Sequence, residues 1–433
     1  MEKVLFLCYY FPPMGMGGTQ RSAKFVKYLP QFNWEPIVIT VKNVRYYAHD
    51  DSLLEEIGDP KIIRTESLDP LRISAWLNRV KTIEKPQPRS DTRKGILNIL
   101  NRIISGWLLI PDSKILWLPF AIYRAVKLIN KNKIKIIYTT SPPHSAHLGG
   151  MAIKLMTGVK WIADFRDDWT GGESQPSPTI FHTFLNRLLE KFVLKYADRI
   201  IAMCEHLTTH LFKKSGNIKM HGKFATIMNG YDPEDFSEVL NFLPNARFTI
   251  THCGSVSRVS DPEPFLKAMQ NLFHNYPEMT NKIQVQFIGM DLFNRLDELV
   301  SNFDLKPYIK PIRYLPHNDA VKEVTRSHLL LLTIFKKTNE EIITGKFFEY
   351  LASGKPILLI SSEGEVARIV RKLNRGSVVP NDDISGIEQA ILNYFNKFEN
   401  GELSFDRPLS VPQFDRKQQT RELSEIFDQS VTG

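Results

Sequence analysis

The strongest constraint on the fold is an alternation of short, β-branched apolar runs with longer amphipathic segments. This alternation predicts repeated strand-helix-strand units and a parallel sheet. The runs are almost continuously hydrophobic, as expected for strands that are covered on both faces. The expected strands are Val4–Cys8, Pro36–Thr40, Ile134–Thr139, Trp161–Asp164, Arg199–Met203, Phe224–Met228, Phe248–Cys253, Val285–Ile288, Leu329–Phe335, Ile357–Ile360 and Ser377–Val379.

The pattern lapses in the polar, turn-rich stretch Asn229–Pro244 and then begins again. We therefore predict an α/β protein with two Rossmann-like, doubly wound parallel-sheet domains, at residues 1–240 and 241–409, and a C-terminal helical tail at 410–433. Each domain opens with a strand that runs into glycine. Ligands of open parallel sheets bind at the carboxyl ends of the strands, so substrates are expected in a central cleft between two facing domains.

The composition, with 42% hydrophobic and 24% charged residues, is that of an ordinary soluble globular protein. No apolar run approaches the roughly 18 to 20 residues of a membrane-spanning helix. The apolar segment Val4–Phe11 follows Glu2 and precedes Pro12-Pro13, which predicts a buried strand and not a secretion signal. The three cysteines are widely separated, which favours a reduced, cytoplasmic setting. They are Cys8, Cys204 and Cys253.

The formal charge of +9 is concentrated in one segment. Between Arg72 and Lys135 there are 14 basic and three acidic residues, a local excess of +11. We interpret residues 72–135 as a basic insertion in the first domain. Its aromatic residues Trp107, Trp117 and Phe120 either rest on anionic lipid or belong to the core beneath solvated Lys and Arg side chains. No nucleic-acid-binding module is recognisable, so we expect no nucleic-acid partner.

A glycine-rich segment, Met14-Gly15-Met16-Gly17-Gly18-Thr19, follows the first strand and precedes the helical stretch Gln20–Leu29. Glycines allow close approach of backbone to a ligand, and the amides of the following helix favour a phosphate. The segment lacks the third glycine of the dinucleotide fingerprint and the Gly-Lys-Ser/Thr of the triphosphate loop. From the spacing alone, a phosphate cradle and a simple tight turn both remain open.

A second motif, from Glu341 to Pro356, lies between two expected strands at the carboxyl edge of the second sheet. A helix is expected to begin near Thr344, with Glu341 on the approach loop, Glu349 within the helix and Gly354 at its end. A carboxylate can accept hydrogen bonds from two adjacent sugar hydroxyls, and a helix start with Lys346 could hold a diphosphate. The alternative, a solvated charge pair on a surface helix, remains open.

A third set of polar residues follows two neighbouring strands. It comprises Ser141–His147 and Ala163–Trp169, which offer imidazole, carboxylate and guanidinium groups. The histidines could be structural, and Asp164-Phe165-Arg166-Asp167 could be an internal ion pair that holds a loop. A metal site on Asp164, Asp167 and Asp168 is disfavoured, because no His or further acid lies at a convincing ligand spacing.

Taken together, these residues resemble the retaining nucleotide-sugar glycosyltransferases of the GT-B fold, in particular glycosyltransferase family four. Five stretches carry the resemblance, in order along nearly the whole chain, and the last is the most specific. They are Tyr10-Phe11-Pro12-Pro13 with Gly17-Gly18, Ser141-Pro142-Pro143 through His147, Asp164-Phe165-Arg166-Asp167 with Trp169, Asn229-Gly230-Tyr231-Asp232 with Phe236, and Glu341 with Glu349 followed by Tyr-Leu-Ala-x-Gly-Lys-Pro.

The resemblance implies a role for each matched residue. Glu349 would hold the ribose, and Glu341 would hold hydroxyls of the donor sugar. Arg258 would neutralise the leaving diphosphate. The remaining donor contacts would come from Gly17, Gly18, Gly254, Ile343, Thr344, Gly345 and Lys346.

On the acceptor side, the resemblance puts His147 beside the sugar at the reaction centre, with His144 as the alternative. Asp164, Arg166 and Asp167 would line the acceptor side or brace that wall. Two departures concern the diphosphate: Ile343-Thr344 stand where typical members carry Phe-Gly, and no second basic residue closely follows Arg258. The contacts to the diphosphate are therefore expected to differ in detail.

The implied activity is transfer, with retention, of a hexosyl or N-acetylhexosaminyl group from a nucleotide diphosphate sugar to a hydroxyl of a polysaccharide or lipid-linked glycan. A UDP-sugar is the favoured donor, no cofactor or metal is required, and the expected location is cytoplasmic, with peripheral contact at the inner face of the membrane. Replacing Glu341 or Arg258 by alanine is expected to lower turnover by on the order of 10²-fold or more. A GT-B epimerase and a non-catalytic nucleotide-sugar-binding relative remain alternatives.

Overall fold

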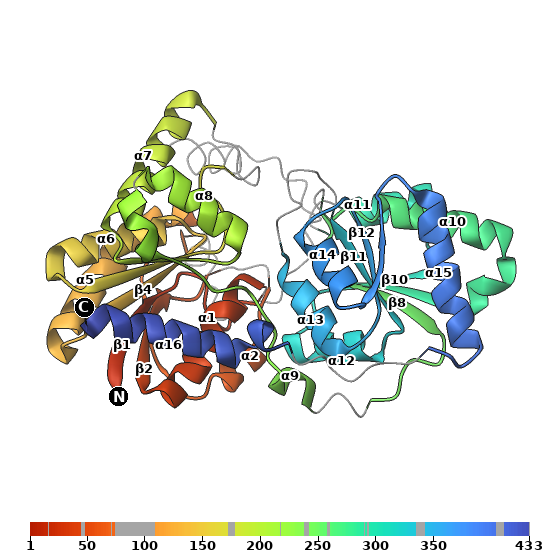
Figure 1. Ribbon diagram of the computed structural model, residues 1–433, viewed down its shortest axis with the longest axis horizontal. Coiled ribbons are helices and arrows are strands. Elements are labelled where there is room, and N and C mark those ends of the chain that lie inside the picture. Colours follow the sequence, from red (N-terminus) through yellow and green to blue (C-terminus); the bar gives the residue numbers. More distant parts are fainter. Residues whose placement is uncertain are drawn as a thin grey trace. The chain divides into compact units, whose positions relative to one another are not determined.

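The computed structural model describes residues 1–15, 17–44, 48–70, 72–73, 109–171, 178–216, 218–237, 242–257, 260–289, 291, 294–334, 343–403 and 411–432. The chain forms two compact units (Figure 1). The first contains Met1–Asn229 and Arg416–Gly433, and the second contains Gly230–Asp415. The sequence had placed the first boundary at residue 240 and the start of the tail at 410.

The first unit is built on a seven-stranded sheet in the order β3-β2-β1-β4-β5-β6-β7. All of its strand pairs are parallel. The strands are β1 (Glu2–Leu7), β2 (Trp34–Val41), β3 (Lys61–Thr65), β4 (Ile136–Ser141), β5 (Lys160–Phe165), β6 (Arg199–Ala202) and β7 (Phe224–Thr226). Its helices are α1 (Gly17–Tyr28), α2 (Ser52–Glu56), α5 (Leu118–Asn132), α6 (Ser145–Thr157), α7 (Ile180–Tyr196), α8 (Glu205–Ser215) and α16 (Arg416–Thr432), with 3-10 helices at Leu29–Phe32, Ser113–Trp117 and Ile218–Lys223.

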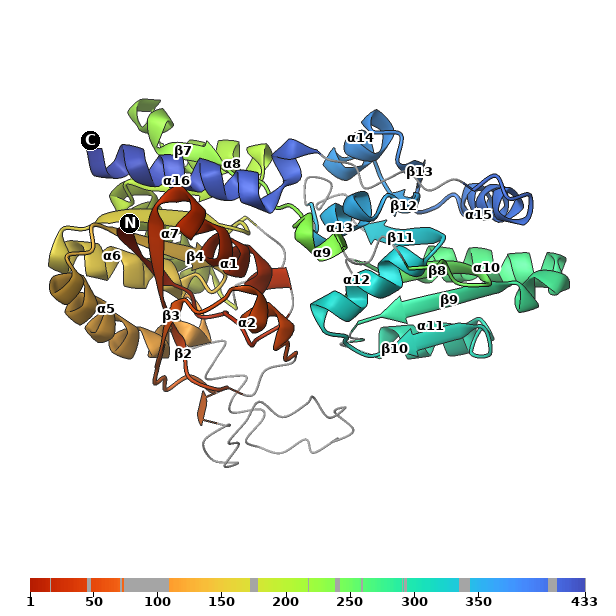
Figure 2. The same cartoon turned by 90° about the horizontal axis from the view of Figure 1, so that it is seen from below.

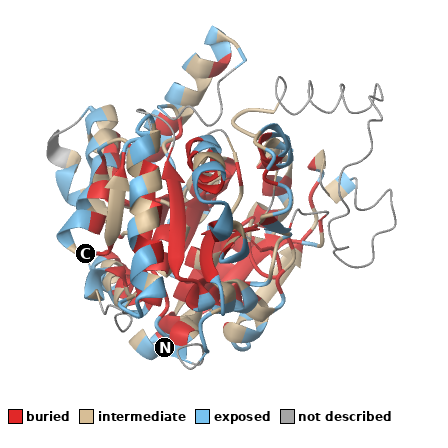
Figure 3. Cartoon of the chain, turned by 90° about the vertical axis from the view of Figure 1, so that its right-hand side faces the viewer, coloured by how far each residue is buried: buried red, intermediate tan, exposed pale blue. Residues whose placement is uncertain are grey.

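Both faces of this sheet are covered, as the continuous hydrophobicity of its strands predicts. Leu5 and Leu7 of β1 pack in the core beneath α5, α6, α7 and α8. The alternate residues Val4 and Phe6 pack in a second core with α1 and α16. This division follows from the two-residue period of a strand. Buried residues accordingly concentrate on the strands (Figure 3).

The C-terminal helix α16 completes the first unit. Its Phe427 ring lies 5.3 Å from that of Trp34, whose indole nitrogen donates a hydrogen bond to Asp428 at 3.1 Å. At the other end of α16, Gln419 donates to the carbonyl of Asn229 at 3.1 Å. The expected terminal helix is therefore confirmed, and it covers one face of the first sheet.

The second unit holds a six-stranded parallel sheet in the order β10-β9-β8-β11-β12-β13 (Figure 2). The strands are β8 (Phe248–Cys253), β9 (Ile283–Ile288), β10 (Ile309–Ile312), β11 (Leu329–Ile334), β12 (Ile357–Ser361) and β13 (Gly376–Val379). The helices are α9 (Glu234–Ser237), α10 (Glu263–Asn275), α11 (Arg295–Asn302), α12 (His317–Arg326), α13 (Gly345–Ser353), α14 (Glu365–Lys372) and α15 (Ile384–Glu399), with 3-10 helices at Pro277–Asn281 and Pro412–Phe414. One core lies between this sheet and α10, α11 and α15.

The expected α/β fold with two doubly wound parallel sheets is confirmed. Two strands, β3 and β10, were not predicted. Both lie at the edge of a sheet, and neither is continuously buried: β3 has one buried residue, and β10 includes the exposed Lys310 and Pro311. A short, half-exposed edge strand lacks the apolar run that identified the central strands.

The strand order fixes where a ligand can bind in each unit. In the first sheet the order reverses between β1 and β4, and in the second it reverses between β8 and β11. The loops that leave the carboxyl ends of such a pair diverge and leave a crevice for ligand. The predicted motifs follow β1, β4, β8 and β11, so each unit presents them at its own reversal point.

The described part of the basic segment 72–135 decides between lipid contact and core packing for Trp117. Trp117 does not face lipid, because its side chain is fully buried, donates to Thr65 Oγ1 at 2.8 Å and packs edge-on against Tyr9. Phe120 is half-buried on α5, and Trp107 lies outside the described residues. Within those residues no helix is long and apolar enough to cross a membrane.

Candidate active site

Helix α13 carries the most specific motif and begins where the sequence predicts. Thr344 precedes it in an extended conformation, with φ −74° and ψ 147°, and Gly354 ends it with φ 72°. Phe347, Phe348 and Leu351 are buried and anchor the helix on the sheet. Lys346 and Glu349 are three residues apart and therefore lie on the same side of α13. The two motif side chains thus share one face near the helix start.

Lys346 reaches back to the carboxyl end of β8. Its Nζ lies 3.2 Å from Nε2 of His252 and beneath Gly254, which has φ 136°. The backbone angle favours glycine here, and a β-carbon would lie 2.9 Å from Lys346 Nζ and displace the end of that side chain. Burial lowers the pKa of Lys346 to about 8, which leaves most of the ammonium charged at pH 7 but costs free energy.

His252 is a neutral partner for this ammonium. Burial and then the Lys346 charge hold its pKa well below the ordinary value of 6.5. A charged Lys346 can only donate, so Nε2 of His252 accepts and the ring proton lies on Nδ1. The Lys346 ammonium is therefore held by a neutral ring, and the carboxylate that acts on its charge is that of Glu349 on the same helix.

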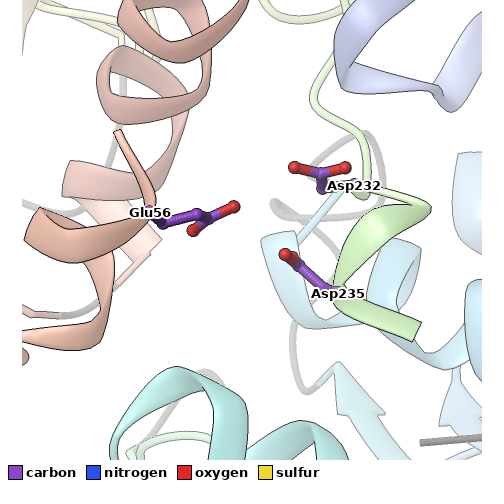
Figure 4. A group of neighbouring side chains, drawn as sticks. All are labelled: Glu56, Asp232 and Asp235. Atoms are coloured by element: carbon purple, nitrogen blue, oxygen red, sulfur yellow. The ribbon is translucent and has the colours of Figure 1, made fainter. Parts of the chain in front are cut away.

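Glu349 belongs to a short chain of ionisable groups. Its Oε1 lies 3.7 Å from Nδ1 of His317, the first residue of α12. Nε2 of the same ring lies 2.8 Å from Oδ2 of Asp235. The Asp235 side chain projects from α9 (Figure 4). His317 therefore lies at ion-pair distance from the Glu349 carboxylate and joins it to Asp235.

The start of α13 offers further donors to a phosphate. The first backbone amides of a helix have no partner within the helix and attract anions. Thr344 Oγ1 is buried and has no hydrogen-bond partner among the described residues. Gly345 has open space where a side chain would be, and Ile343 is buried. The sequence-predicted residues Glu341 and Arg258 lie outside the described residues.

In the first unit, the glycine segment is tied to Arg166. The Arg166 guanidinium donates to the carbonyls of Gly18, Pro142 and Ser141, the last at 3.1 Å. A β-carbon on Gly18 would lie 3.0 Å from Nη1 of Arg166, whereas Gly17 has room for a side chain. Arg166 thus joins the loops after β1, β4 and β5. These contacts hold the loops together, which corresponds to the bracing role expected for Arg166 and not to the acceptor-lining role.

Asp164 is entirely buried and forms an internal ion pair. Arg21 of α1 contacts both of its carboxylate oxygens, at 3.0 and 2.9 Å, while Tyr138 and Thr140 donate to Oδ2 at 2.6 and 3.1 Å. Burial raises the pKa of Asp164, but the Arg21 charge and these donors outweigh it, so the net pKa is lowered. The carboxylate is fully buried and braces the sheet from within.

His147 lies in the first turn of α6 and is fully buried. Trp161 donates to Thr139 Oγ1 at 2.8 Å, and the same oxygen lies 2.8 Å from His147 Nδ1. Because the indole can only donate, the Thr139 hydroxyl proton is directed to Nδ1, and the imidazole proton then lies on Nε2. Nε2 has no partner among the described residues. It is a donor that a substrate oxygen could satisfy.

His144 and Asp167 complete the predicted set. His144 stacks on Trp169 with ring centroids 4.9 Å apart, and its Nδ1 has no partner within the described part of the chain. Burial lowers the pKa values of His144 and His147 to about 3 each. Asp167 is exposed. Both histidines are therefore neutral near pH 7 and act by hydrogen bonding, not as charges.

Two residues beside the site were missed by the sequence analysis. His252 could have been found, because it is a polar residue near the end of an otherwise apolar strand that runs into Gly254. His317 gave no such signal, since it follows the unpredicted edge strand β10. Its role depends on α12 and α13 being neighbours, which only the fold determines.

Residues 78–235 match the sequence model of glycosyltransferase family 4. The whole chain has the fold of GT-B glycosyltransferases. It is 13% identical to sucrose-phosphate synthase from Thermosynechococcus elongatus, with a TM-score of 0.64 over 100% of this chain and 98% of that one. Residues 78–235 are therefore similar in sequence to glycosyltransferase family 4, and the whole chain is similar in fold to GT-B glycosyltransferases.

Two further solved structures share this fold. The lipopolysaccharide outer core galactosyltransferase WaaB, in its apo form, is 12% identical, with a TM-score of 0.54 and coverage of 99% of both chains. The UDP-GlcNAc 2-epimerase from Methanocaldococcus jannaschii is 11% identical, with a TM-score of 0.55 over 99% of this chain and 100% of that one. No curated protein matches the sequence. At these identities the structures establish the fold of this chain and not its substrates.

Replacing His317 by asparagine should weaken nucleotide binding by about fivefold, because Glu349 would lose an orienting partner worth about 1 kcal/mol. His317 does not reach the reacting atoms, so KM for the donor should rise while kcat stays constant. Steady-state kinetics with a nucleotide-sugar donor that supports turnover would measure both. His274→Asn, at an exposed position of the same unit, should change neither, and an equal fall in kcat would contradict a positioning role.

Acid should destabilise the first unit through its buried histidines. The folded pKa of His147, about 3, lies below the ordinary 6.5, so the unfolded chain takes up the proton first and stability is lost as the pH falls from 6.5 towards 3. Between pH 7 and 5 this amounts to about 2 kcal/mol for His147. His147→Asn should remove that part of the pH dependence in urea unfolding.

Tryptophan fluorescence isolates this effect, because all six tryptophans lie in the first unit, between Trp34 and Trp169. The exposed His206 of the same unit supplies the matched control, His206→Asn, which should retain the wild-type pH dependence. A His147→Asn variant with the full wild-type loss between pH 7 and 5 would contradict the assignment.

Proposed function

We propose that this chain is a retaining glycosyltransferase that moves a sugar from a nucleotide diphosphate sugar, with UDP-sugars favoured, to a hydroxyl of a polysaccharide or lipid-linked glycan. It works at the cytoplasmic face of a membrane and needs no metal ion. The motif order in the sequence supports retention. The single observation that carries the proposal is the shared face of Lys346 and Glu349 at the start of α13, at the reversal point of the second sheet.

The geometry supports separate binding roles for the residues that would contact the donor. Glu349, held by His317, would accept hydrogen bonds from two neighbouring ribose hydroxyls. Lys346, the free amides at the start of α13 and Thr344 Oγ1 would surround the diphosphate. As the bond to the anomeric carbon breaks, negative charge grows on that diphosphate, and preorganised donors stabilise it more strongly than they stabilise the ground state.

The first unit would supply the acceptor wall. Arg166 and the Arg21–Asp164 pair make the loops after β1, β4 and β5 rigid, and rigid loops hold a reacting hydroxyl with little entropy loss. His147 would donate its Nε2 proton to a sugar oxygen. Because it is neutral, this donor needs no neighbouring carboxylate.

A nucleotide-sugar epimerase is a second candidate, favoured by the fold shared with the UDP-GlcNAc 2-epimerase. The two activities differ in their need for an acceptor. An epimerase would convert the donor sugar by itself, whereas a glycosyltransferase would release nucleotide diphosphate and form a glycoside only when acceptor is present.

The test has two stages. Calorimetric unfolding with UDP-, GDP- and ADP-sugars identifies the nucleotide, because a ligand at 100 times its Kd stabilises by about 2.7 kcal/mol. Turnover of that donor is then followed by NMR with and without soluble and lipid-linked acceptors, which also reports the anomeric configuration of the product. Glu349→Gln should lose the thermal shift, and Glu278→Gln, at an exposed position of the same unit, should keep it. Donor conversion without acceptor would establish the epimerase instead.

A further inference from the structure

Helix α7 presents large apolar side chains to solvent. Its inner side is formed by His182, Glu190, Val193 and Leu194, which are buried. A row at four-residue spacing runs along the outer side, with Phe181 beside its first member. The row and its neighbour, with their exposed fractions, are Ile180 (89%), Phe181 (65%), Phe184 (64%), Leu188 (36%), Phe192 (39%) and Tyr196 (38%).

A basic row runs beside the apolar row. Arg187, Lys191 and Lys195 are exposed and also follow one another at four-residue spacing. The only acid of α7, Glu190, is buried and pairs with Lys214 at 3.0 Å. The outer face of α7 therefore carries three positive charges, no negative charge and a strip of aromatic and aliphatic side chains.

Two simpler explanations fit this face poorly. A helix that only covers the sheet needs one apolar stripe, and α7 already has one on its inner side. Pairing with α7 of a second copy of the chain would bury the apolar row but would also bring two basic rows together, without any acid on the helix to offset them. Exposed apolar surface of this extent marks an interaction site, and its charge selects an anionic partner.

We propose that the outer face of α7 docks on an anionic lipid surface. The 17-residue helix would lie in the plane of the interface, with Phe184, Leu188 and Phe192 among the acyl chains and the basic row at the level of the headgroups. Apolar burial and attraction to anionic headgroups act together in such helices. This surface is distinct from the basic segment 72–135, of which Trp117 is buried in the core.

The position of α7 suggests how membrane docking would serve the proposed function. This link, unlike docking itself, depends on the proposed function. Trp169, just after β5, donates to Asn186 of α7 at 3.0 Å, so the middle of the helix lies near the carboxyl edge of the first sheet, where Arg166 and His147 lie. A lipid-linked acceptor would then be presented along the same edge that would bind its hydroxyl. Docking itself requires no sugar transfer and can be tested alone.

The experiment is co-sedimentation of the full chain with phosphatidylcholine vesicles that contain 30% phosphatidylglycerol, at low salt and without sugar donor. The triple variant Arg187→Gln, Lys191→Gln, Lys195→Gln should bind on the order of 100-fold more weakly, from about fivefold per basic residue. The variant Phe184→Ser, Phe192→Ser should also lose binding, although it keeps the basic row. Vesicles of phosphatidylcholine alone should bind the wild type weakly.

The second unit supplies a control with the same change in charge. Lys306, Lys310 and Arg313 are exposed there, and replacing all three by glutamine should leave vesicle binding intact. Equal loss in this control would show that only net charge matters and would overturn the proposal. So would absence of wild-type binding, or a wild-type dimer that the Phe184→Ser, Phe192→Ser variant dissociates. Turnover with a soluble acceptor should survive both α7 variants, so failure of docking and failure of the proposed function are distinguishable.

Discussion

Replacing Lys346 by methionine should lower kcat by on the order of 10² to 10³-fold while making the second unit more stable. The loss of turnover follows if the ammonium stabilises charge on the departing diphosphate, because removal of one preorganised donor has an effect of this size. The gain in stability follows because methionine fills the same volume without a desolvated charge. The prediction requires both changes in the same variant: a fall in kcat and a rise in the free energy of unfolding.

The sign of the stability change comes from the pKa. In the folded chain the pKa of Lys346 is lowered from 10.5 to about 8 by burial. Below pH 8 the folded state therefore carries the full cost of the charge, and methionine should recover about 1 to 3 kcal/mol at pH 7. The gain should shrink as the pH rises from 8 towards 10.5, where the unfolded chain also loses its proton. Calorimetry would measure it.

Lys355 provides a matched control in the same unit. Burial lowers its pKa to about 8 as well, but it follows the C-terminal end of α13, away from Lys346 and Gly254. Lys355→Met should stabilise the unit by a similar amount and leave kcat unchanged. If Lys346→Met also kept wild-type turnover, the diphosphate would have to be held by other residues.

Replacing Asp164 by asparagine should destabilise the first unit by about 3 to 5 kcal/mol, the cost of leaving one buried charge without its partner. Arg21 is 1% exposed and would keep its charge in the core, where it donates to the carbonyl of Met228 and the amide oxygen of Asn229 and lies near the Glu422 carboxylate. Urea unfolding followed by tryptophan fluorescence would measure the loss, because every tryptophan lies in this unit.

The double variant Arg21→Met, Asp164→Asn separates charge from packing. It should be more stable than Asp164→Asn, since no uncompensated charge remains while asparagine still accepts from Tyr138 and Thr140. As a surface control, Glu35→Gln breaks the partly exposed pair with Lys3 and should cost less than about 1 kcal/mol. A double variant less stable than Asp164→Asn would mean that packing, and not the charge, dominates.

Several features could be derived from local sequence. The central strands were identified because both of their faces are covered, which makes them continuously apolar. The start of α13 at Thr344 and its end at Gly354 were derived because helix ends depend on a few neighbouring residues. The order of motifs after β1, β4, β8 and β11 was also sufficient to place them at the carboxyl edges of two parallel sheets.

Other features depended on contacts between distant segments. The sequence shows that Asp164 and Arg166 are charged and that Trp117 is aromatic. Only the fold shows that Asp164 forms a buried ion pair, that Arg166 holds three loops together and that Trp117 lies in the core. The same holds for His317, which meets Glu349 because α12 packs on α13. Sequence by itself determined the two sheets and the residue types at their edges, since local periodicity encodes burial. Tertiary structure decided which charges are buried, which are paired and which, as on α7, face outward, because pairing and burial depend on neighbours that are remote along the chain.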